Sequence, residues 1–281
     1  MKQRGIALIQ VLLIVAILSI LALYLTKTAR DQVKIAQWFD DKSTALVNLH
    51  SAESELLFSL LTETKTSTSG KIPSKWNFYN KPFNLSPSVQ ILMQDQAGLL
   101  SVHFPDKNLL DKLVGGLSNN KGIKFSDLLL DWQDLDQKPR INGLENSSTR
   151  NGKIPHLQDL IHLNNISPAV YKLLQKNMSI YRSGYYNPMN SPIELLRVLT
   201  NDEIAQRVVQ LRDSKELNKN KFRELTGLKE SENMFFYPSN NIAIKIISTI
   251  GESRVEKEIV VSLTSYAKLD TTPVLLMYVR G

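Results

Sequence analysis

The sequence predicts an α+β fold with three components: a long N-terminal helix whose first half spans a membrane, an antiparallel sheet, and a large α-helical domain inserted between the strands. Three observations predict it. An apolar run of membrane-spanning length lies near the N-terminus, helical periodicity continues beyond that run, and the remaining chain shows strand patterns, then helix patterns, then strand patterns again.

The apolar run covers residues 6–25 and is interrupted only by Gln10 and Ser19. At about 1.5 Å per residue it forms a helix of about 30 Å, which matches the hydrocarbon core of a bilayer. Lys2 and Arg4 precede the run, and the positive-inside tendency therefore places the N-terminus in the cytoplasm and the rest of the chain outside it. We expect residues 6–25 to be transmembrane.

Helical periodicity continues after the apolar run, and no proline occurs before Pro73. Apolar residues recur at spacings of three and four with charged residues between them. These apolar residues are Ile35, Trp38, Phe39, Leu46, Leu49, Leu56, Leu57, Leu60 and Leu61. We predict one helix over residues 6–64, half in lipid and half packed on a globular domain, and we expect Trp38 and Phe39 to take part in that packing.

The chain after this helix divides into three parts. Residues 65–106 combine a Ser/Thr-rich loop with strand-like segments, and residues 89–94 and 99–104 are expected to form a hairpin. Residues 107–235 show mainly short helical patterns, and residues 236–281 show alternating strands that are expected to close an antiparallel meander. A helical block between two groups of strands indicates an insertion into an α+β domain.

Composition and charge exclude several classes of protein. The chain has 281 residues, a formal net charge of +7 and no cysteine, which excludes disulfides, thiolate catalysis and cysteine metal sites. Four of the positive charges, Lys2, Arg4, Lys27 and Arg30, lie in the first thirty residues, which contain no acidic residue. Because the rest of the chain is nearly neutral, the basic balance indicates membrane topology, and we expect no nucleic-acid partner.

The motifs of common enzyme classes are missing from the sequence. It contains no HExxH, GxSxG, GxxxxGK[ST] or GxGxxG pattern, and its four histidines have no metal-binding spacing. We therefore expect no catalytic residues, and we interpret the protein as a non-enzyme.

An acidic cluster is the one candidate ligand site in the sequence. Its members are Asp131, Asp134, Asp136 and Glu145. On a helix, Asp131 and Asp134 share one face, and such a set supplies hard oxygen ligands of the kind that Ca²⁺ takes. The spacing is not that of an EF-hand, and the alternative is that Asp131 and Asp134 are solvated or paired with Lys138 and Arg140.

The short basic leader that ends at Gly5 and directly precedes the apolar helix resembles the type III signal of prepilins. In that family a peptidase cuts after the glycine and the new N-terminus is methylated, which implies cleavage after Gly5 and an N-methylated Ile6. The fifth mature residue is Gln10, where most pilins have glutamate. Lacking that glutamate is typical of the minor pseudopilin K family of type II secretion systems.

The resemblance to the K family extends along the chain. Residues 131–145 resemble the acidic segment around a tryptophan, and residues 156–168 resemble a pair of helices whose second member begins with Ser-Pro. Residues 187–196 resemble the family's N-x-N-T-A-x-x-x-L segment, with Ser191 and Pro192 in place of threonine and alanine. The resemblance implies a pseudopilin fold with a large helical insertion and calcium binding in that insertion.

The resemblance also implies a function and a location. Members of the family initiate or cap the pseudopilus at its tip. The partners that the resemblance implies are minor pseudopilins of the I, J and H types, the major pseudopilin, the prepilin peptidase and the inner-membrane secretion platform. They are single-pass proteins of the bacterial inner membrane with a periplasmic C-terminal domain.

Two other interpretations stay open. A minor pilin of a type IV or DNA-uptake pilus shares the leader and the long helix, but the helical insertion would be missing. A single-span periplasmic anchor protein or enzyme would keep the leader uncut. A cleaved secretory signal fits poorly because residues 23–29 contain no convincing cleavage site.

Overall fold

The computed structural model describes residues 4–115, 124–163, 166–181, 183–265, 267–268 and 270–280. Residues 1–3 of the expected leader lie outside this part. The helices are α1 (Arg4–Thr62), α2 (Lys107–Gly115), α3 (Phe125–Gln133), α4 (Pro168–Asn177), α5 (Ile193–Leu199), α6 (Asp202–Asp213) and α7 (Lys219–Thr226), with 3₁₀ helices η1 (Gln96–Gly98), η2 (Leu157–His162) and η3 (Pro188–Asn190). The strands are β1 (Phe83–Ser86), β2 (Val89–Asp95), β3 (Leu100–Ser101), β4 (Met178–Ser179), β5 (Asn241–Ile250), β6 (Ser253–Leu263) and β7 (Val274–Arg280).

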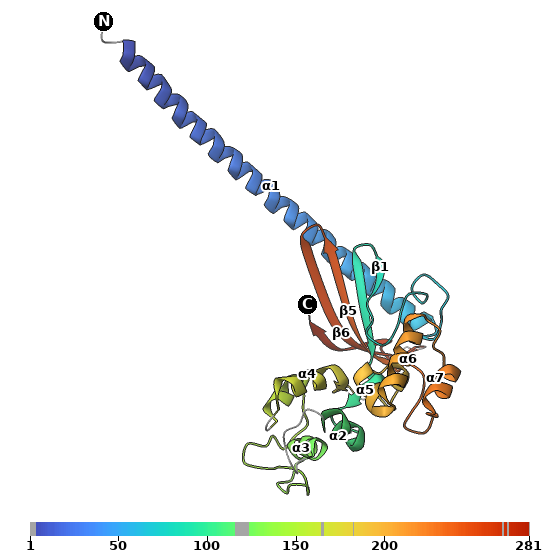
Figure 1. The fold of residues 1–281 in the computed structure, drawn as a ribbon. Coiled ribbons are helices and arrows are strands. Elements are labelled where there is room, and N and C mark those ends of the chain that lie inside the picture. Colours follow the sequence, from blue (N-terminus) through green and yellow to red (C-terminus); the bar gives the residue numbers. More distant parts are fainter. Residues whose placement is uncertain are drawn as a thin grey trace.

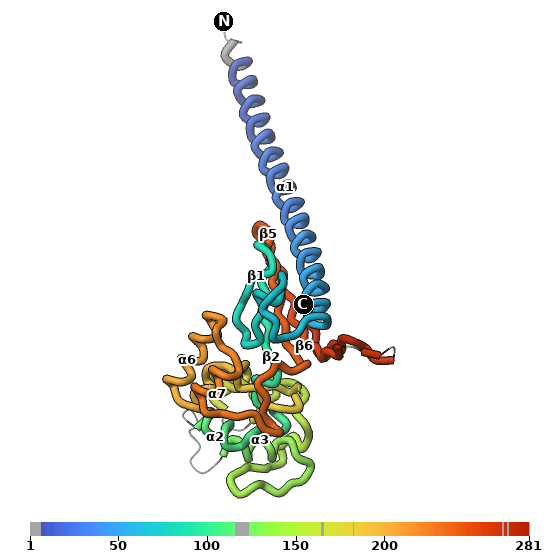
Figure 2. The backbone as a smooth tube through the Cα atoms, turned by 90° about the vertical axis from the view of Figure 1, so that its right-hand side faces the viewer, coloured from blue at the N-terminus to red at the C-terminus, as the bar shows by residue number. Residues whose placement is uncertain are grey.

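The long N-terminal helix is confirmed. α1 contains 59 residues, which corresponds to about 88 Å at about 1.5 Å per residue. Its first half projects away from the rest of the molecule, and its second half lies along the sheet (Figures 1 and 2).

The main sheet is antiparallel throughout, with the strand order β1-β2-β5-β6-β7. The meander of three closing strands is therefore confirmed. β2 and β5 are direct neighbours although the whole helical block lies between them in the sequence. The helices are thus inserted between two paired strands.

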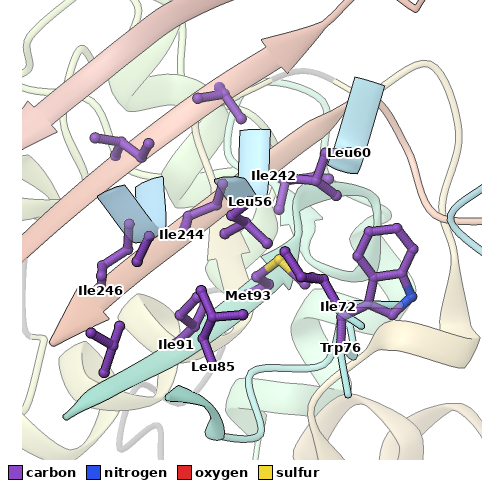
Figure 3. Packing of buried hydrophobic residues seen from close by; sticks show 14 of the residues in the cluster. Leu56, Leu60, Ile72, Trp76, Leu85, Ile91, Met93, Ile242, Ile244 and Ile246 are labelled. Carbon is purple, nitrogen blue, oxygen red and sulfur yellow. The ribbon is translucent and has the colours of Figure 1, made fainter. Parts of the chain in front are cut away.

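The core of the body forms between α1 and this sheet. The buried residues of α1 follow one another at spacings of three and four, which places them on one face of the helix. They are Ala45, Leu49, Ala52, Leu56 and Leu60. Figure 3 shows Leu56 and Leu60 against side chains of β2 and β5, among them Met93, Ile242 and Ile244.

The expected packing of Trp38 and Phe39 is wrong. Trp38 is 45% exposed and Phe39 is 62% exposed, whereas Trp76 and Phe78 are buried in the core as aromatic residues usually are. The reason is the length of the sheet. The β5–β6 turn reaches α1 near Trp38 and Asp41: the hydroxyl of Ser253 donates to the carbonyl of Trp38 (3.3 Å), and the carboxylate of Asp41 lies 2.2 Å from where a Cβ on Gly251 would be. On the N-terminal side of this turn the sheet does not cover the helix.

The expected hairpin of residues 89–94 and 99–104 is also wrong. β3 does not return along β2 but pairs in parallel with β4 in a separate two-stranded sheet. η1 redirects the chain after β2, and Gly98 passes so close to η3 that a Cβ there would lie 2.6 Å from the carbonyl oxygen of Asn190. β3 thus belongs to the insertion, where Leu100 is buried in the core of α2–α5.

The carboxylate of Asp95 joins both ends of the insertion to the sheet. It is fully buried at the end of β2 and accepts hydrogen bonds from the backbone N–H of Ala97 (3.0 Å), from the side-chain amides of Asn187 (3.0 Å) and Asn190 (2.9 Å), and from the N–H (3.0 Å) and hydroxyl (2.6 Å) of Ser239. Hydrogen bonds to an ionised buried acceptor are among the strong ones. Asp95 therefore fixes where the insertion leaves the sheet and where it returns.

Replacing Asp95 by asparagine is expected to lower the free energy of unfolding by about 2–4 kcal/mol, because an amide nitrogen would face buried N–H donors that then lose their acceptor. Urea unfolding of the full chain in detergent, followed by tryptophan fluorescence, measures this. Asp40→Asn, on an exposed part of α1, serves as the control and is expected to have no effect. Equal stabilities of the two variants would contradict the role given to Asp95.

Candidate membrane-spanning helix and candidate metal centre

The N-terminal half of α1 is long and apolar enough to cross a membrane. Its most apolar window of 18 residues has a mean hydropathy of 2.8, and none of it is buried inside the molecule. The predicted processing residues Gly5 and Ile6 lie in the first turn of α1. Gln10 lies in the following turn with an exposed side chain, so its amide is open to a neighbouring helix.

A second exposed apolar surface follows on α1 beyond the span. We call it the exposed spine surface, and it consists of Val33, Ile35, Trp38, Phe39, Leu46, Val47 and Phe58. With 3.6 residues per turn, these side chains lie on several sides of the helix, so the surface surrounds this part of α1. Large apolar side chains exposed along one helix are suited to contacts with further helices.

The acidic cluster lies at the end of α3 and in the loop that follows. Asp131 is fully buried in the last turn of α3, and Asp134 is the residue at which the helix ends. Asp131 accepts hydrogen bonds from the backbone N–H and the guanidinium of Arg140. Gly143 packs against the same carboxylate, and a Cβ at that position would lie 1.8 Å from one of its oxygens. The loop thus folds back on Asp131.

The guanidinium of Arg140 bridges Asp131 and Asp134. These two hydrogen bonds raise the pKa of Arg140, against the opposing effect of burial. The pairing with Arg140 that the sequence left open as the alternative is therefore present for Asp131 and for one oxygen of Asp134. Lys138 forms no ion pair within the described part of the chain, and its backbone N–H donates to Asp136.

The other three carboxylates converge. One oxygen each of Asp134, Asp136 and Glu145 lie within 4.8 Å of one another. The second oxygen of Asp134 and both oxygens of Glu145 are buried and have no hydrogen-bond partner. Desolvation, followed by repulsion from Asp134, Asp136 and Asp131, raises the pKa of Glu145. The geometry thus concentrates negative charge around a single guanidinium, that of Arg140, which pairs with Asp134.

These three residues fit a calcium ion. Two ligands on opposite sides of Ca²⁺, each at about 2.4 Å, are about 4.8 Å apart, so carboxylate oxygens within that distance can share one ion. Buried acceptor oxygens without donors are the kind of ligand that a hard cation takes. Asp131 does not fit, because Arg140 occupies its carboxylate. The residues that could hold such an ion are therefore Asp134, Asp136 and Glu145, without Asp131.

The architecture defines the class of fold. A long apolar helix docked by its second half on an antiparallel sheet, with helices inserted between paired strands, is an α+β fold of the pseudopilin type. A solved structure similar to this chain belongs to the GspK-GspI-GspJ complex from the type 2 secretion system of enterotoxigenic Escherichia coli. The similarity has a TM-score of 0.52 at 13% sequence identity and covers 90% of this chain and 98% of that one. No family model and no curated protein matches the sequence.

Sequence reasoning did not find every polar group of interest. Asp95, Lys65 and Arg212 are buried charges that it passed over. Each is a single charged residue in an otherwise ordinary segment, and its burial depends on residues far away in the chain. Only the segment 187–196, which the sequence had singled out, pointed toward one of them: the side-chain amides of Asn187 and Asn190 donate hydrogen bonds to Asp95.

The raised pKa of Glu145 leads to a pH-dependent prediction. The folded state favours the protonated carboxyl, so this group's contribution to stability is present below its ordinary pKa of 4.5 and is lost as the pH rises through the raised value. Glutamine mimics the neutral form. Glu145→Gln is therefore expected to melt at a higher temperature than the parent protein at pH 7 in the presence of a chelator, and the difference is expected to shrink toward pH 4.5.

Differential scanning calorimetry of the full chain in detergent measures this, with Glu63→Gln, at an exposed site, as the control. Identical melting temperatures of parent and Glu145→Gln across the pH range would show that the surroundings of Glu145 do not destabilise its ionised carboxylate.

Proposed function

We propose that the protein is a minor pseudopilin at the tip of the pseudopilus of a type II secretion system, where it initiates or caps assembly for protein export across the outer membrane. The observation that carries this proposal is the joint presence of the exposed α1 and the large insertion between β2 and β5, over a similarity that covers nearly all of both chains. The proposed role is assembly by helix packing, without bond chemistry.

The exposed spine surface supports assembly with other helices. In a bundle of such subunits, apolar residues such as Trp38, Phe39 and Val47 would be buried between neighbours, which is favourable by about 25 cal/mol for each Å² of apolar surface. The proposed partners are minor pseudopilins of the I, J and H types and the major pseudopilin, with the prepilin peptidase and the inner-membrane platform acting during processing and assembly. Gln10 would lie at the interface in place of the usual glutamate.

The proposed location is the bacterial inner membrane, with residues 6–25 across the bilayer, the N-terminus in the cytoplasm and the sheet and insertion in the periplasm. The insertion favours this role over that of a minor pilin of a type IV or DNA-uptake pilus, for which we expected no such insertion. It also makes the membrane-distal end of the molecule broad (Figure 1), which fits a subunit above which no further subunit stacks.

Coexpression with a prepilin peptidase is expected to yield a chain that begins at an N-methylated Ile6. Mass spectrometry of the membrane-extracted protein measures the N-terminus, and expression in a host without the peptidase is the control that keeps Met1 or Lys2 as the first residue. A chain that keeps the leader in the presence of the peptidase would favour the single-span anchor protein instead.

We also propose that the acidic cluster binds calcium in the periplasm, with Asp134, Asp136 and Glu145 as ligands. The converging, partnerless oxygens support this proposal. The ion would neutralise the charge on these residues and tie the loop after α3 to the helix end, so its role is to stabilise the insertion.

Replacing both Asp134 and Asp136 by asparagine is expected to weaken calcium binding at least about tenfold from a Kd of about 10⁻⁴ M, because two of the three charged ligands are lost. Isothermal titration calorimetry of the chelator-treated protein measures this, and Asp40→Asn is the matched control. Unchanged affinity of the double variant would eliminate the site while leaving the proposed role in assembly intact.

A further inference from the structure

A cleft lies between the body and the insertion, on the side of the molecule where the loop after α1 lies beside α6 and α7 (Figure 1). Its volume is about 710 Å³, within the range of roughly 300–1,000 Å³ typical of ligand pockets. Lys65 and Trp76 line it from the body, and Arg212, Lys215 and Phe236 line it from the insertion and the segment that leads back to β5.

Two of the cations that line this cleft are almost completely buried. Lys65 is 6% exposed and Arg212 is 5% exposed. Buried charges are normally paired with an opposite charge. In the part of the chain that the structure describes, however, neither of them forms an ion pair with a carboxylate, and neither does Lys215 at the rim.

The acidic residues nearby are already engaged. Asp95 is held by its five donors, Asp213 pairs with Lys81 at 2.8 Å, and Glu216 pairs with Lys221 at 3.4 Å. Lys219, a fourth cation at the cleft, pairs with Glu230 at 3.1 Å. In the described residues, Asp95 therefore acts on Lys65, and Asp213 on Arg212, only through attraction at longer range, and no carboxylate pairs directly with either cation.

The partners of these cations are neutral oxygens that leave hydrogen-bonding capacity unused. The Lys65 amine donates to the carbonyl of Ser239 (2.7 Å) and to the side chain of Asn240 (2.6 Å), which leaves one of its three hydrogens. The Arg212 guanidinium donates to the carbonyls of Ser191 (2.7 Å) and Pro188 (3.1 Å), and its Nε has no partner.

Burial lowers the pKa of both the Lys65 amine and the Arg212 guanidinium. Desolvation lowers the pKa of Lys65 to about 8 and that of Arg212 to about 10. An anion in the cleft would restore the balance, because a negative charge favours the charged form of each base. The guanidinium also lies over the ring of Tyr79, 5.2 Å from its centroid, which holds it in place.

The remaining lining indicates what kind of anion fits. Trp76, Phe78, Tyr79 and Phe236 lie beside the cations along the cleft, and of these Tyr79 is half-buried whereas the other three are buried. A cleft of this volume that combines cations with apolar edges is larger than a small inorganic anion fills, whereas a polypeptide segment brings apolar side chains together with carboxylates. We propose that the cleft binds an extended segment of another polypeptide through its carboxylates. This site goes beyond the assembly of membrane helices and does not depend on it.

A labelled peptide tests the proposal on the full-length protein in detergent, without any other pilus component. The probe is fluorescein-labelled Ser-Gly-Phe-Asp-Glu with a free C-terminal carboxylate, and its neutral counterpart is Ser-Gly-Phe-Asn-Gln with an amidated C-terminus. Fluorescence anisotropy is expected to give at least about tenfold tighter binding of the acidic peptide, a difference that corresponds to about 1.4 kcal/mol.

Lys215→Glu reverses one charge at the exposed rim, where the Lys215 amine donates a hydrogen bond to the carbonyl of Ser74, and is expected to weaken binding of the acidic peptide at least tenfold. Lys172→Glu on α4, exposed and outside the cleft, is the matched control and is expected to leave binding unchanged. Circular dichroism of each variant verifies the fold.

Equal binding of the two peptides, or equal effects of the two lysine variants, would overturn the proposal. Competition by inorganic phosphate identifies the ligand class: a phosphate affinity that exceeds the affinity for the acidic peptide would also overturn it, since the cleft would then be a simple anion site. None of these outcomes bears on N-terminal processing. The proposed peptide site and the proposed role in assembly are therefore tested independently of each other.

Discussion

Five hydrogen-bond donors meet at the carboxylate of Asp95, and the arrangement of the two halves of the molecule depends on them. β2 and β5 must pair although the insertion separates them, and closing so long a loop opposes that pairing entropically. Asp95 lies where the chain leaves β2, and Ser239 lies just before β5 begins. The same carboxylate holds Asn187 and Asn190 of the insertion, so closure of the sheet and docking of the helices form one cooperative unit.

α1 is subject to a different constraint, because the sheet is shorter than the helix. The body covers α1 from about Ala45 onward and reaches it as far back as Trp38, while the apolar span ends at residue 25. The stretch between them follows the apolar span and is not covered by the sheet, yet it carries Val33, Ile35 and the exposed ring of Trp38. Apolar residues on an otherwise amphipathic helix lower the free energy only when something covers them. A partner helix supplies that cover in the proposed assembly.

Local patterns in the sequence predicted what depends on local physics. Apolar run length and periodicity predicted α1, and alternation predicted the meander β5–β7. The position of Trp38 was predicted wrongly because a helical period is the same whether the covering surface comes from the chain itself or from a neighbour. The prediction of a hairpin was wrong because β3 pairs with β4, 78 residues further along the chain (Leu100 with Met178). No turn signal in the sequence indicates a pairing between such distant segments. The sequence was sufficient to find the acidic residues, but that Arg140 pairs with Asp131 and Asp134 could be seen only in the folded loop.

The insertion and its boundary with the body carry charges of both signs that ion pairs balance only in part. At the end of α3, the carboxylates of Asp131, Asp134, Asp136 and Glu145 outnumber the single guanidinium of Arg140. At the cleft, the charges of Lys65 and Arg212 meet only neutral oxygens. Desolvated charges without counter-charges lower stability, and a fold that keeps them gains from ligands that bind only the native state. Under the two proposals, both sites are completed from outside, one by a cation and the other by carboxylates of a second chain.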